Sequence, residues 1–267
     1  MVRPHRFYLP GHTWHLTHRC HKREFLFRFA RDRRRWMHWL FEAKKRYGLQ
    51  VLNYVVTSNH IHLLVHGSGN RMAIPRAMQL MAGRVAQEYN ARKHRQGAFW
   101  EDRYHATAVE NGTHLRRCMT YIDLNMVRAG VVRHPSEWSF GGYHELERRP
   151  KRYGRIDRSL LVQLAGLSNQ EELSAWRRER VDAAIRERGS LLSREYYWSE
   201  KLALGSPAYI ARVKREFGID VDACRIEEAE ECATLREARG AYDIFSDDGI
   251  EALSAGNRLR WDVSPSQ

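Results

Sequence analysis

Two apolar, β-branched segments that lie next to each other constrain the fold most strongly. The run LQVLNYVV at residues 49–56 and the run HIHLLVH at residues 60–66 are separated only by Thr57-Ser58-Asn59. Apolar runs joined by a short polar turn are typical of adjacent antiparallel strands. The pattern predicts a β-hairpin that needs further elements to cover it.

The flanking segments supply these elements. Polar and apolar residues nearly alternate in HTWHLTHR, at residues 12–19. This pattern predicts a first strand with one solvent-exposed face. Apolar residues at helical spacing predict helices over 31–47, ended by Gly48, and over 71–93, and a fourth strand fits Tyr104–Glu110. The resulting βαββαβ order is the ferredoxin-like unit, in which two helices cover one face of an antiparallel sheet. We expect function on the other, free face.

The chain after this unit has a different character. Asn111–Gly130 predicts a third helix, capped by Asn111 or Thr113 and ended by Gly130. Beyond Pro150, helical patterns recur at 158–167, 170–188, 198–204 and 206–217. We therefore expect an α+β fold with a sheet-containing domain at 1–150, an all-α region at 151–240 and a disordered tail at 241–267.

Charge divides the chain in the same place. The formal net charge is +13, and residues 1–150 hold 26 Lys and Arg against 11 Asp and Glu, together with all 14 histidines. Such a basic half suggests a polyanionic partner, because cations attract phosphates and release their counterions. The chain has four widely spaced cysteines, no signal-like segment and no long apolar run, which indicates a cytoplasmic protein that neither enters a membrane nor is secreted. A nucleic-acid partner would make it nucleoid-associated.

The second strand of the hairpin carries the first candidate site. Side chains alternate along a strand, so His60 and His62 share one face while Ile61 points to the core. Their Cα atoms should stand roughly 6.6 Å apart, which lets two imidazoles converge on one divalent ion. Histidines at this spacing are also found as structural residues, so the pair alone leaves both interpretations open.

The third helix carries the second candidate site. At 100° per residue its apolar side chains fall within one arc, made of Leu115, Met119, Ile122, Met126 and Ala129. Tyr121 and Asn125 lie one turn apart on a flank of that arc, with Arg117 and Arg128 on its solvent side. These groups predict a phosphate site, although a boundary tyrosine with solubilising arginines would give the same pattern.

Three segments together carry a resemblance: SNHIHLLV, GAFWEDRYHATAVE and YIDLNMVRAG. Over residues 8–145 the chain resembles the HUH-type single-tyrosine transposases. Within them it looks most like the REP-associated branch, which processes single-stranded hairpins from palindromic repeats. The segment LALGSPAYIARVKREFG is similar to a recurring part of that branch's C-terminal region.

The resemblance implies roles for particular residues. His60 and His62 would bind Mg²⁺ or Mn²⁺, Asn125 matches a third metal ligand, and Tyr121 would be the nucleophile of a transesterification. A hard cation accepts an amide oxygen and can polarise a phosphodiester, and a tyrosine needs activation near neutral pH. Single-stranded or hairpin DNA is the implied partner, with no nucleotide cofactor. Further candidate DNA contacts are Trp100, Arg103, Tyr104, His105, Arg117 and Arg128; Phe99 is better explained as core.

One position departs from the family pattern. Many relatives have proline after the Leu-Asn pair, and this chain has Met126. We therefore expect a less kinked helix, which bears on the direction in which Asn125 points.

Other functions fit parts of the same pattern. A nucleic-acid-binding module without catalysis would not need Tyr121, but the closely spaced aromatics of RNA-binding sheets are missing. A metal-dependent nuclease would use His60 and His62 to deliver water and would form no covalent DNA adduct. Replication initiators and relaxases share the chemistry but usually carry a helicase or a second tyrosine, and the chain has no Walker loop. The sequence is compatible with a monomer or a homodimer.

Overall fold

The computed structural model describes residues 8–148, 150, 152–187, 198, 201–217, 224–229 and 232–237. The chain begins with the predicted βαββαβ order. Its elements are β1 (Thr13–Arg19), α1 (Ala30–Tyr47), β2 (Gln50–Val56), β3 (His60–His66), α2 (Ala73–Lys93) and β4 (His105–Val109).

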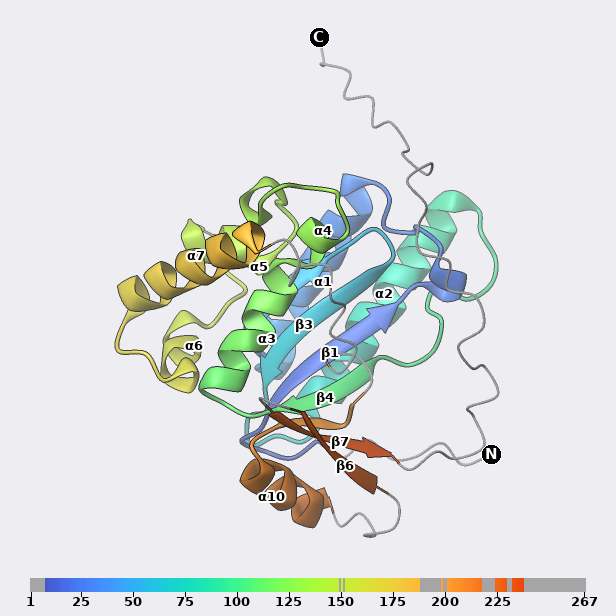
Figure 1. Cartoon of the computed structure of the whole chain (residues 1–267). Coiled ribbons are helices and arrows are strands. Elements are labelled where there is room, and N and C mark those ends of the chain that lie inside the picture. The colour runs from blue at the N-terminus through green and yellow to red at the C-terminus, as the bar shows by residue number, and fades with distance from the viewer. Residues whose placement is uncertain are drawn as a thin grey trace.

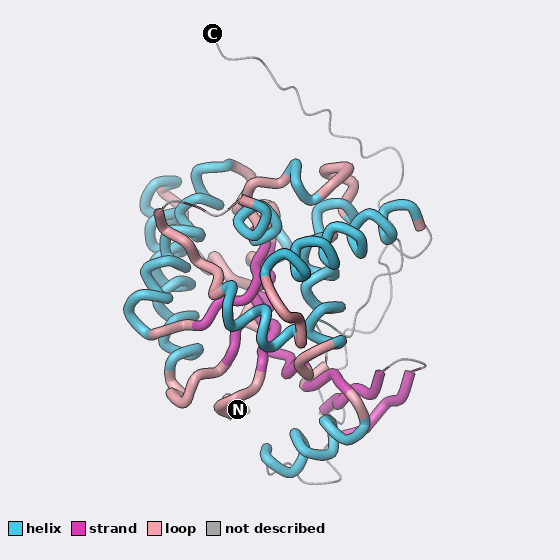
Figure 2. Tube along the Cα trace, turned by 90° about the vertical axis from the view of Figure 1, so that its left-hand side faces the viewer, coloured by secondary structure: helices cyan, strands magenta, loops and turns pink. Residues whose placement is uncertain are grey.

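These four strands form an antiparallel sheet in the order β2-β3-β1-β4. This is the strand order of a ferredoxin-like fold, so the predicted fold class is confirmed. Helices α1 and α2 lie together behind the sheet in Figure 1, and Figure 2 shows helices on both sides of the strands. In the register, Thr17 of β1 is paired with His62 of β3 on one side and with His105 of β4 on the other.

The face covered by α1 and α2 holds an apolar core. The alternate residues of β1 and β3 that point to it are almost fully buried, and so are the facing helix residues. Each large apolar side chain buried in this way contributes about 1.5–3 kcal/mol. The sheet contributes Trp14, Leu16, Ile61, Leu63 and Val65, and the helices contribute Trp36, Leu40, Met78 and Met81.

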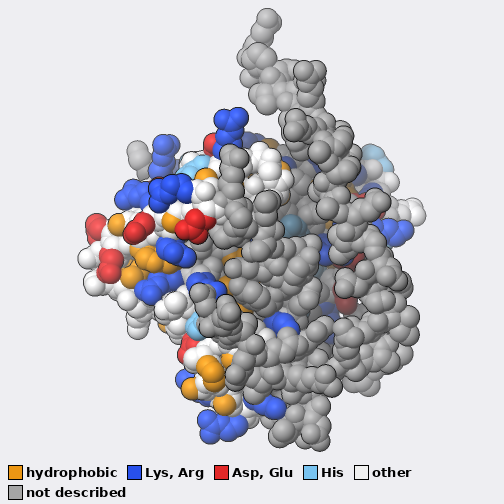
Figure 3. Space-filling view, in the orientation of Figure 1, with side chains coloured by type: hydrophobic (Ala, Val, Ile, Leu, Met, Phe, Trp, Pro, Cys, Tyr) orange, Lys and Arg blue, Asp and Glu red, His pale blue; other side chains and the backbone are white. Residues whose placement is uncertain are grey.

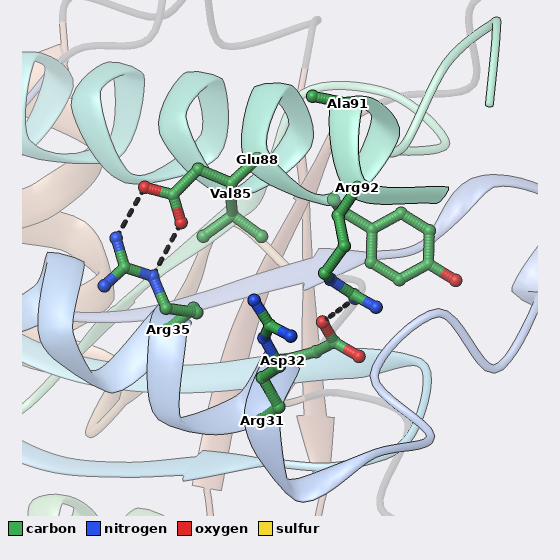
Figure 4. A pocket seen from close by; sticks show the side chains of 8 residues that line it. Arg31, Asp32, Arg35, Val85, Glu88, Ala91 and Arg92 are labelled. Atoms are coloured by element: carbon green, nitrogen blue, oxygen red, sulfur yellow. Dashed lines mark hydrogen bonds and ion pairs between the residues drawn. The ribbon is translucent and has the colours of Figure 1, made fainter. Parts of the chain in front are cut away.

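Helices α1 and α2 enclose a charged pocket on their outer side, with a volume of about 560 Å³. Figure 4 shows two ion pairs that cross it, Arg35 with Glu88 and Arg92 with Asp32. Arg35 and Glu88 are partly exposed, with 43% and 34% of their side-chain surfaces accessible. The ion pairs that line this pocket therefore join α1 to α2. The pocket lies behind the sheet, away from His60 and His62.

The predicted third helix is divided in two. Helix α3 (Thr113–Asp123) ends at Leu124, whose ψ of 0° departs from helical geometry, and α4 (Asn125–Arg128) follows. Gly112 precedes α3 without a side-chain cap, so the expected caps Asn111 and Thr113 are wrong, while Gly130 follows α4 with φ +67°. The helix is interrupted at Leu124 although no proline follows Asn125, and the expected smaller kink than in proline-bearing relatives stays a prediction. Four residues of the expected buried arc are buried, but Ala129 is exposed.

The chain after residue 150 packs on the first unit and is not all-α. Helices α6 (Arg158–Ala165), α7 (Gln170–Arg186) and α10 (Pro207–Phe217) agree with the predicted helical patterns. However, β5 (Ala203–Gly205), β6 (Cys224–Ala229) and β7 (Cys232–Glu237) extend the sheet beyond β4. The expected helix over 198–204 is thus wrong at its end, because residues 203–205 pair with β4 and β7. The expected tail at 241–267 lies outside the described residues.

The surface of this later part is mixed in charge. On the face drawn in Figure 3, basic and acidic side chains alternate over α6 and α7, at the left. Two shorter elements lead into it, a 3₁₀ turn at Pro135–Glu137 and α5 (Gly142–Glu147). No helix among the described residues is long and apolar enough to cross a membrane.

Candidate active site on the histidine face

The sheet face opposite α1 and α2 is polar, and we call it the histidine face. Its side chains come from alternate residues of three neighbouring strands, so the register alone brings them together. Most of them are buried although they are polar. Buried polar groups are stable only when they are hydrogen-bonded, which makes each bond on this face a fixed part of its geometry. The polar members of this face are Thr13, His15, Thr17, Arg19, His60, His62, His66, His105 and Thr107, and the apolar Leu64 and Val109 lie among them.

His62 lies at the centre of this face and contacts groups from three elements. Its Nδ1 is 2.9 Å from Nε2 of His15 and 3.2 Å from Oγ1 of Thr17, both on β1. The amide nitrogen of Asn125, at the start of α4, donates to its Nε2 over 3.0 Å. Burial lowers the pKa of His62 well below its ordinary value and that of His15 to about 3, because charging a buried imidazole is costly.

His60 stands at the beginning of β3, beside His62. The two ring centroids are 4.9 Å apart, with the rings nearly perpendicular. Nδ1 of His60 is held by the turn that precedes the strand, at 2.6 Å from Oδ1 of Asn59 and 3.0 Å from Oγ1 of Thr57. Both histidines are therefore anchored through Nδ1, which directs Nε2 of each ring away from its anchor.

Tyr121 reaches the same cluster from α3. Its ring centroid is 5.6 Å from that of His62 and 6.0 Å from that of His15, and only 7% of the residue is exposed. The Arg128 guanidinium lies 4.0 Å from the ring centroid and donates to the backbone carbonyl of Tyr121 over 2.7 Å. The ring of Trp198 packs at 5.8 Å on the tyrosine. The predicted nucleophile, both histidines, Asn125 and Arg128 are thus brought together.

A buried ion pair fixes the helix that carries Tyr121. Asp123, between Tyr121 and Asn125, accepts two hydrogen bonds from Arg177 of α7, at 2.6 and 2.8 Å, with both side chains 1% exposed. Asn53 of β2 also donates to Asp123, over 2.9 Å. The bidentate geometry holds α3 against the sheet on one side and α7 on the other. It thereby fixes the residues on either side of Asp123.

Gly142 makes room for this network at the start of α5. A Cβ atom there would meet Oδ1 of Asn53 at 2.2 Å and Cδ1 of Ile156 at 2.9 Å. Only glycine lets α5 approach β2 this closely without displacing Asn53.

The donor set fits a divalent ion of the hard or borderline kind. No group of three His, Cys, Asp or Glu suited to a metal occurs in the part of the chain that the structure describes. Two imidazoles anchored through Nδ1 leave Nε2 for coordination, the arrangement in which second-shell hydrogen bonds orient metal-binding histidines. A half-turn of the Asn125 amide would direct Oδ1 toward the same point as Nε2 of His62. Asn125 is therefore the residue that could complete a three-ligand set.

Two of the predicted DNA contacts, Trp100 and Tyr104, lie on the other side of the sheet. Trp100 stacks on His18 at 3.9 Å and donates to the Ala82 carbonyl of α2, and Tyr104 lies 6.1 Å from His18. Since His18 alternates with His15 and Thr17, these rings belong to the side of the sheet that α1 and α2 cover.

Of the other predicted contacts, His105 is on the histidine face, Arg117 is on α3 and Arg103 is on the surface. Nε2 of His105 lies 3.0 Å from the Lys201 carbonyl oxygen, so this residue contacts the chain after α7. Arg117 acts on His114, whose pKa is lowered mainly by burial and further by this positive charge. Arg103 is exposed. Phe99 is 2% exposed, which confirms it as core.

Sequence reasoning missed several residues that build the site. His15 and Thr17 lie in a strand whose alternating pattern placed them on its solvent-exposed face. That pattern could have identified them as candidates for the site. Asp123, Arg177 and Trp198 had no such signal, because their partners are 54 or more residues away in sequence.

Residues 9–125 match the model of the family described as "Transposase IS200 like". No curated protein matches the chain. A solved structure described as the REP-associated tyrosine transposase bound to a REP hairpin is 21% identical, covering 58% of this chain and 90% of that chain, with a TM-score of 0.45.

A second solved structure, from Deinococcus radiodurans R1 and described provisionally as a transposase, is 16% identical. It covers 49% of this chain and 98% of that chain, with a TM-score of 0.33. Both TM-scores are below 0.5, and the family match covers residues 9–125, a little under half of the chain.

Proposed function

We propose that the chain is a member of the IS200-like transposase family, whose model matches residues 9–125, and that it cuts and rejoins single-stranded or hairpin DNA through Tyr121. The observation that carries the proposal is the convergence of Tyr121, His62 and Asn125 at the meeting point of α3, β3 and α4. A phenol beside two imidazoles and an amide is the constellation that a metal-assisted phosphoryl transfer needs.

The proposed reaction is a transesterification. Oη of Tyr121 forms a bond to the phosphorus as the bond from phosphorus to the 3′-oxygen breaks. The phenol loses its proton and the departing oxygen gains one, so the products are a 5′-phosphotyrosine and a 3′-hydroxyl. Attack by a 3′-hydroxyl on the phosphotyrosine reverses these changes and joins the strands without a nucleotide cofactor.

We assign a different role to each group of residues in the site. His60, His62 and Asn125 would hold Mg²⁺ or Mn²⁺, which when bound polarises the phosphodiester. Arg128 holds the tyrosine by its ring and its carbonyl and adds positive charge where the phosphate arrives. Trp198 and His15 pack on the same ring and exclude water from its flanks.

The DNA partner is proposed on the same basis. We propose hairpins formed by palindromic repeats as the substrate class, in line with the description of the hairpin-bound structure. The basic half of the chain, with 26 Lys and Arg before residue 151, supplies the attraction for phosphates.

The test is incubation of the purified protein with labelled hairpin DNA and Mn²⁺ or Mg²⁺, resolved on a denaturing gel. We expect a covalent protein–DNA species that Tyr121→Phe abolishes and that Tyr89→Phe, on the opposite side of the sheet, retains. Cleavage that persists in Tyr121→Phe would show a nuclease that uses water. No cleavage across a panel of hairpins with either metal would favour a binding module.

A further inference from the structure

Asn125 and two histidines of the histidine face form one continuous line of hydrogen bonds. The line runs from Asn125 through His62 and His15 to the backbone carbonyl of Trp198. The successive donor–acceptor distances are 3.0, 2.9 and 2.8 Å. Both histidines are almost completely inaccessible, with exposures of 2% and 0%, so water does not compete for these bonds.

The two ends of the line fix its direction. A backbone carbonyl can only accept, so Nδ1 of His15 must carry the proton that it shares with Trp198. At the other end, the amide nitrogen of Asn125 can only donate, so Nε2 of His62 accepts, Nδ1 of His62 holds the proton, and the lone pair on Nε2 of His15 accepts from it.

The position of this proton determines whether the other nitrogen of His62, Nε2, can bind a metal ion. A neutral imidazole that carries its proton on Nδ1 presents a lone pair on Nε2. Nε2 is the atom that accepts from the Asn125 amide and that would face a metal ion. The opposite tautomer would place a hydrogen there and prevent coordination.

We infer that His15 is a positioning residue that fixes His62 in the Nδ1-protonated tautomer and that the carbonyl of Trp198 sets this state. The inference rests on the proposed function for its purpose, since it makes Nε2 of His62 a metal ligand, but its protonation pattern holds in the metal-free protein. It also gives the C-terminal region a role, because a residue beyond α7 determines the state of a ligand on β3.

Neighbouring groups support the same arrangement. Oγ1 of Thr17 lies 3.2 Å from Nδ1 of His62 and is a second, weaker acceptor for its proton. Thr107 donates to the carbonyl of Lys201 over 2.7 Å and lies 3.3 Å from that of Trp198, so β4 holds this part of the C-terminal region in place.

The first experiment measures the tautomer directly. Metal-free protein labelled with ¹⁵N at its histidine rings is examined by long-range ¹H–¹⁵N correlation, with His15→Gln and His62→Gln to assign the two rings. We expect Nδ1 of His15 and Nδ1 of His62 to be protonated and both Nε2 atoms to be unprotonated. A proton on Nε2 of His62 in the wild-type protein overturns the inference, whatever any variant does.

The second experiment measures Mn²⁺ affinity by calorimetry, without DNA. His15→Leu removes the acceptor, and we expect it to weaken Mn²⁺ binding by about 10- to 100-fold, the usual effect of losing a second-shell partner. His15→Gln keeps one donor and one acceptor and should restore most of the affinity. A His15→Leu variant that folds, binds Mn²⁺ normally and keeps the tautomer would contradict the inference.

The two proposals fail in distinguishable ways. If Tyr121 forms no adduct but the Nδ1 tautomer and the His15 dependence of Mn²⁺ binding are found, the transesterification is wrong and the inference stands. If the adduct forms and His62 carries its proton on Nε2, the reverse holds.

Discussion

The two faces of the central sheet are stabilised by different means. The face covered by α1 and α2 buries apolar side chains, and its charged pair Arg35–Glu88 stays at a partly exposed rim. The histidine face buries polar groups, and its charged pair Asp123–Arg177 is 1% exposed on both sides. Apolar packing has no direction, whereas each buried polar group needs a partner at a set distance and angle. The second face therefore specifies the positions of its side chains, as a preorganised site requires.

The largest expected effect comes from breaking the buried ion pair. Arg177→Ala leaves Asp123 as an uncompensated buried charge, and we expect a loss of about 3–5 kcal/mol in the free energy of unfolding. Urea denaturation followed by circular dichroism measures it. Arg178→Ala, next in sequence on an exposed rim pair, is the matched control. A loss below about 1 kcal/mol in Arg177→Ala would mean that the polar face does not hold α3 as described.

The next-largest effects are expected for two neighbouring residues of β3 whose side chains point to opposite faces of the sheet. Leu63 points to the apolar core and His62 to the histidine face. Leu63→Ala should cost about 2–5 kcal/mol of stability while the folded fraction keeps its adduct formation. His62→Ala should reduce adduct formation by at least about 100-fold, because the loss of a ligand exceeds that of a second-shell group.

Both effects are measured on the same two preparations, by denaturation and by the rate of adduct formation. If His62→Ala lowered the free energy of unfolding but left the rate of adduct formation unchanged, the two faces would not differ in the way described.

Per pH unit, a smaller effect is expected on acidification. The pKa of His15 falls from 6.5 to about 3 through burial, so below pH 6.5 the unfolded chain takes up a proton that the folded chain does not. Stability should therefore decrease as the pH falls from 6.5 toward 3, by at most about 1.4 kcal/mol per pH unit for this group. Denaturation of the wild-type protein and of His15→Gln at a series of pH values measures the difference. Parallel curves for the two proteins would contradict the prediction.

The smallest effect is expected at the rim of the helix-covered face. Arg35→Ala removes a bidentate pair with Glu88 that is partly exposed, and such pairs contribute about 0–1 kcal/mol. The loss should shrink further at high salt, because screening weakens exposed charges. Thermal denaturation at low and high ionic strength measures both quantities. A loss as large as that of Arg177→Ala would show that burial is not what separates the two pairs.

Much of the first unit could be predicted because its signals are local. Alternation in HTWHLTHR and HIHLLVH, helical spacing around Trp36 and Met81, and glycine at position 48 each depend on residues a few positions apart. The resemblance to the transposase family also predicted that His60, His62, Tyr121 and Asn125 belong to one site. The break at Leu124 and the strand at 203–205 could not be predicted, because local spacing favoured a helix at both places.

The sequence by itself determined which residues form strands and helices in the first unit and which side chains share a strand face, because alternation and helical spacing are properties of neighbouring residues. Only the tertiary structure decided which groups meet. The contacts of His15 with Trp198, of Asp123 with Arg177 and of Asn125 with His62 join residues 183, 54 and 63 positions apart. Such contacts depend on strand register and helix packing, which no local pattern in one sequence records.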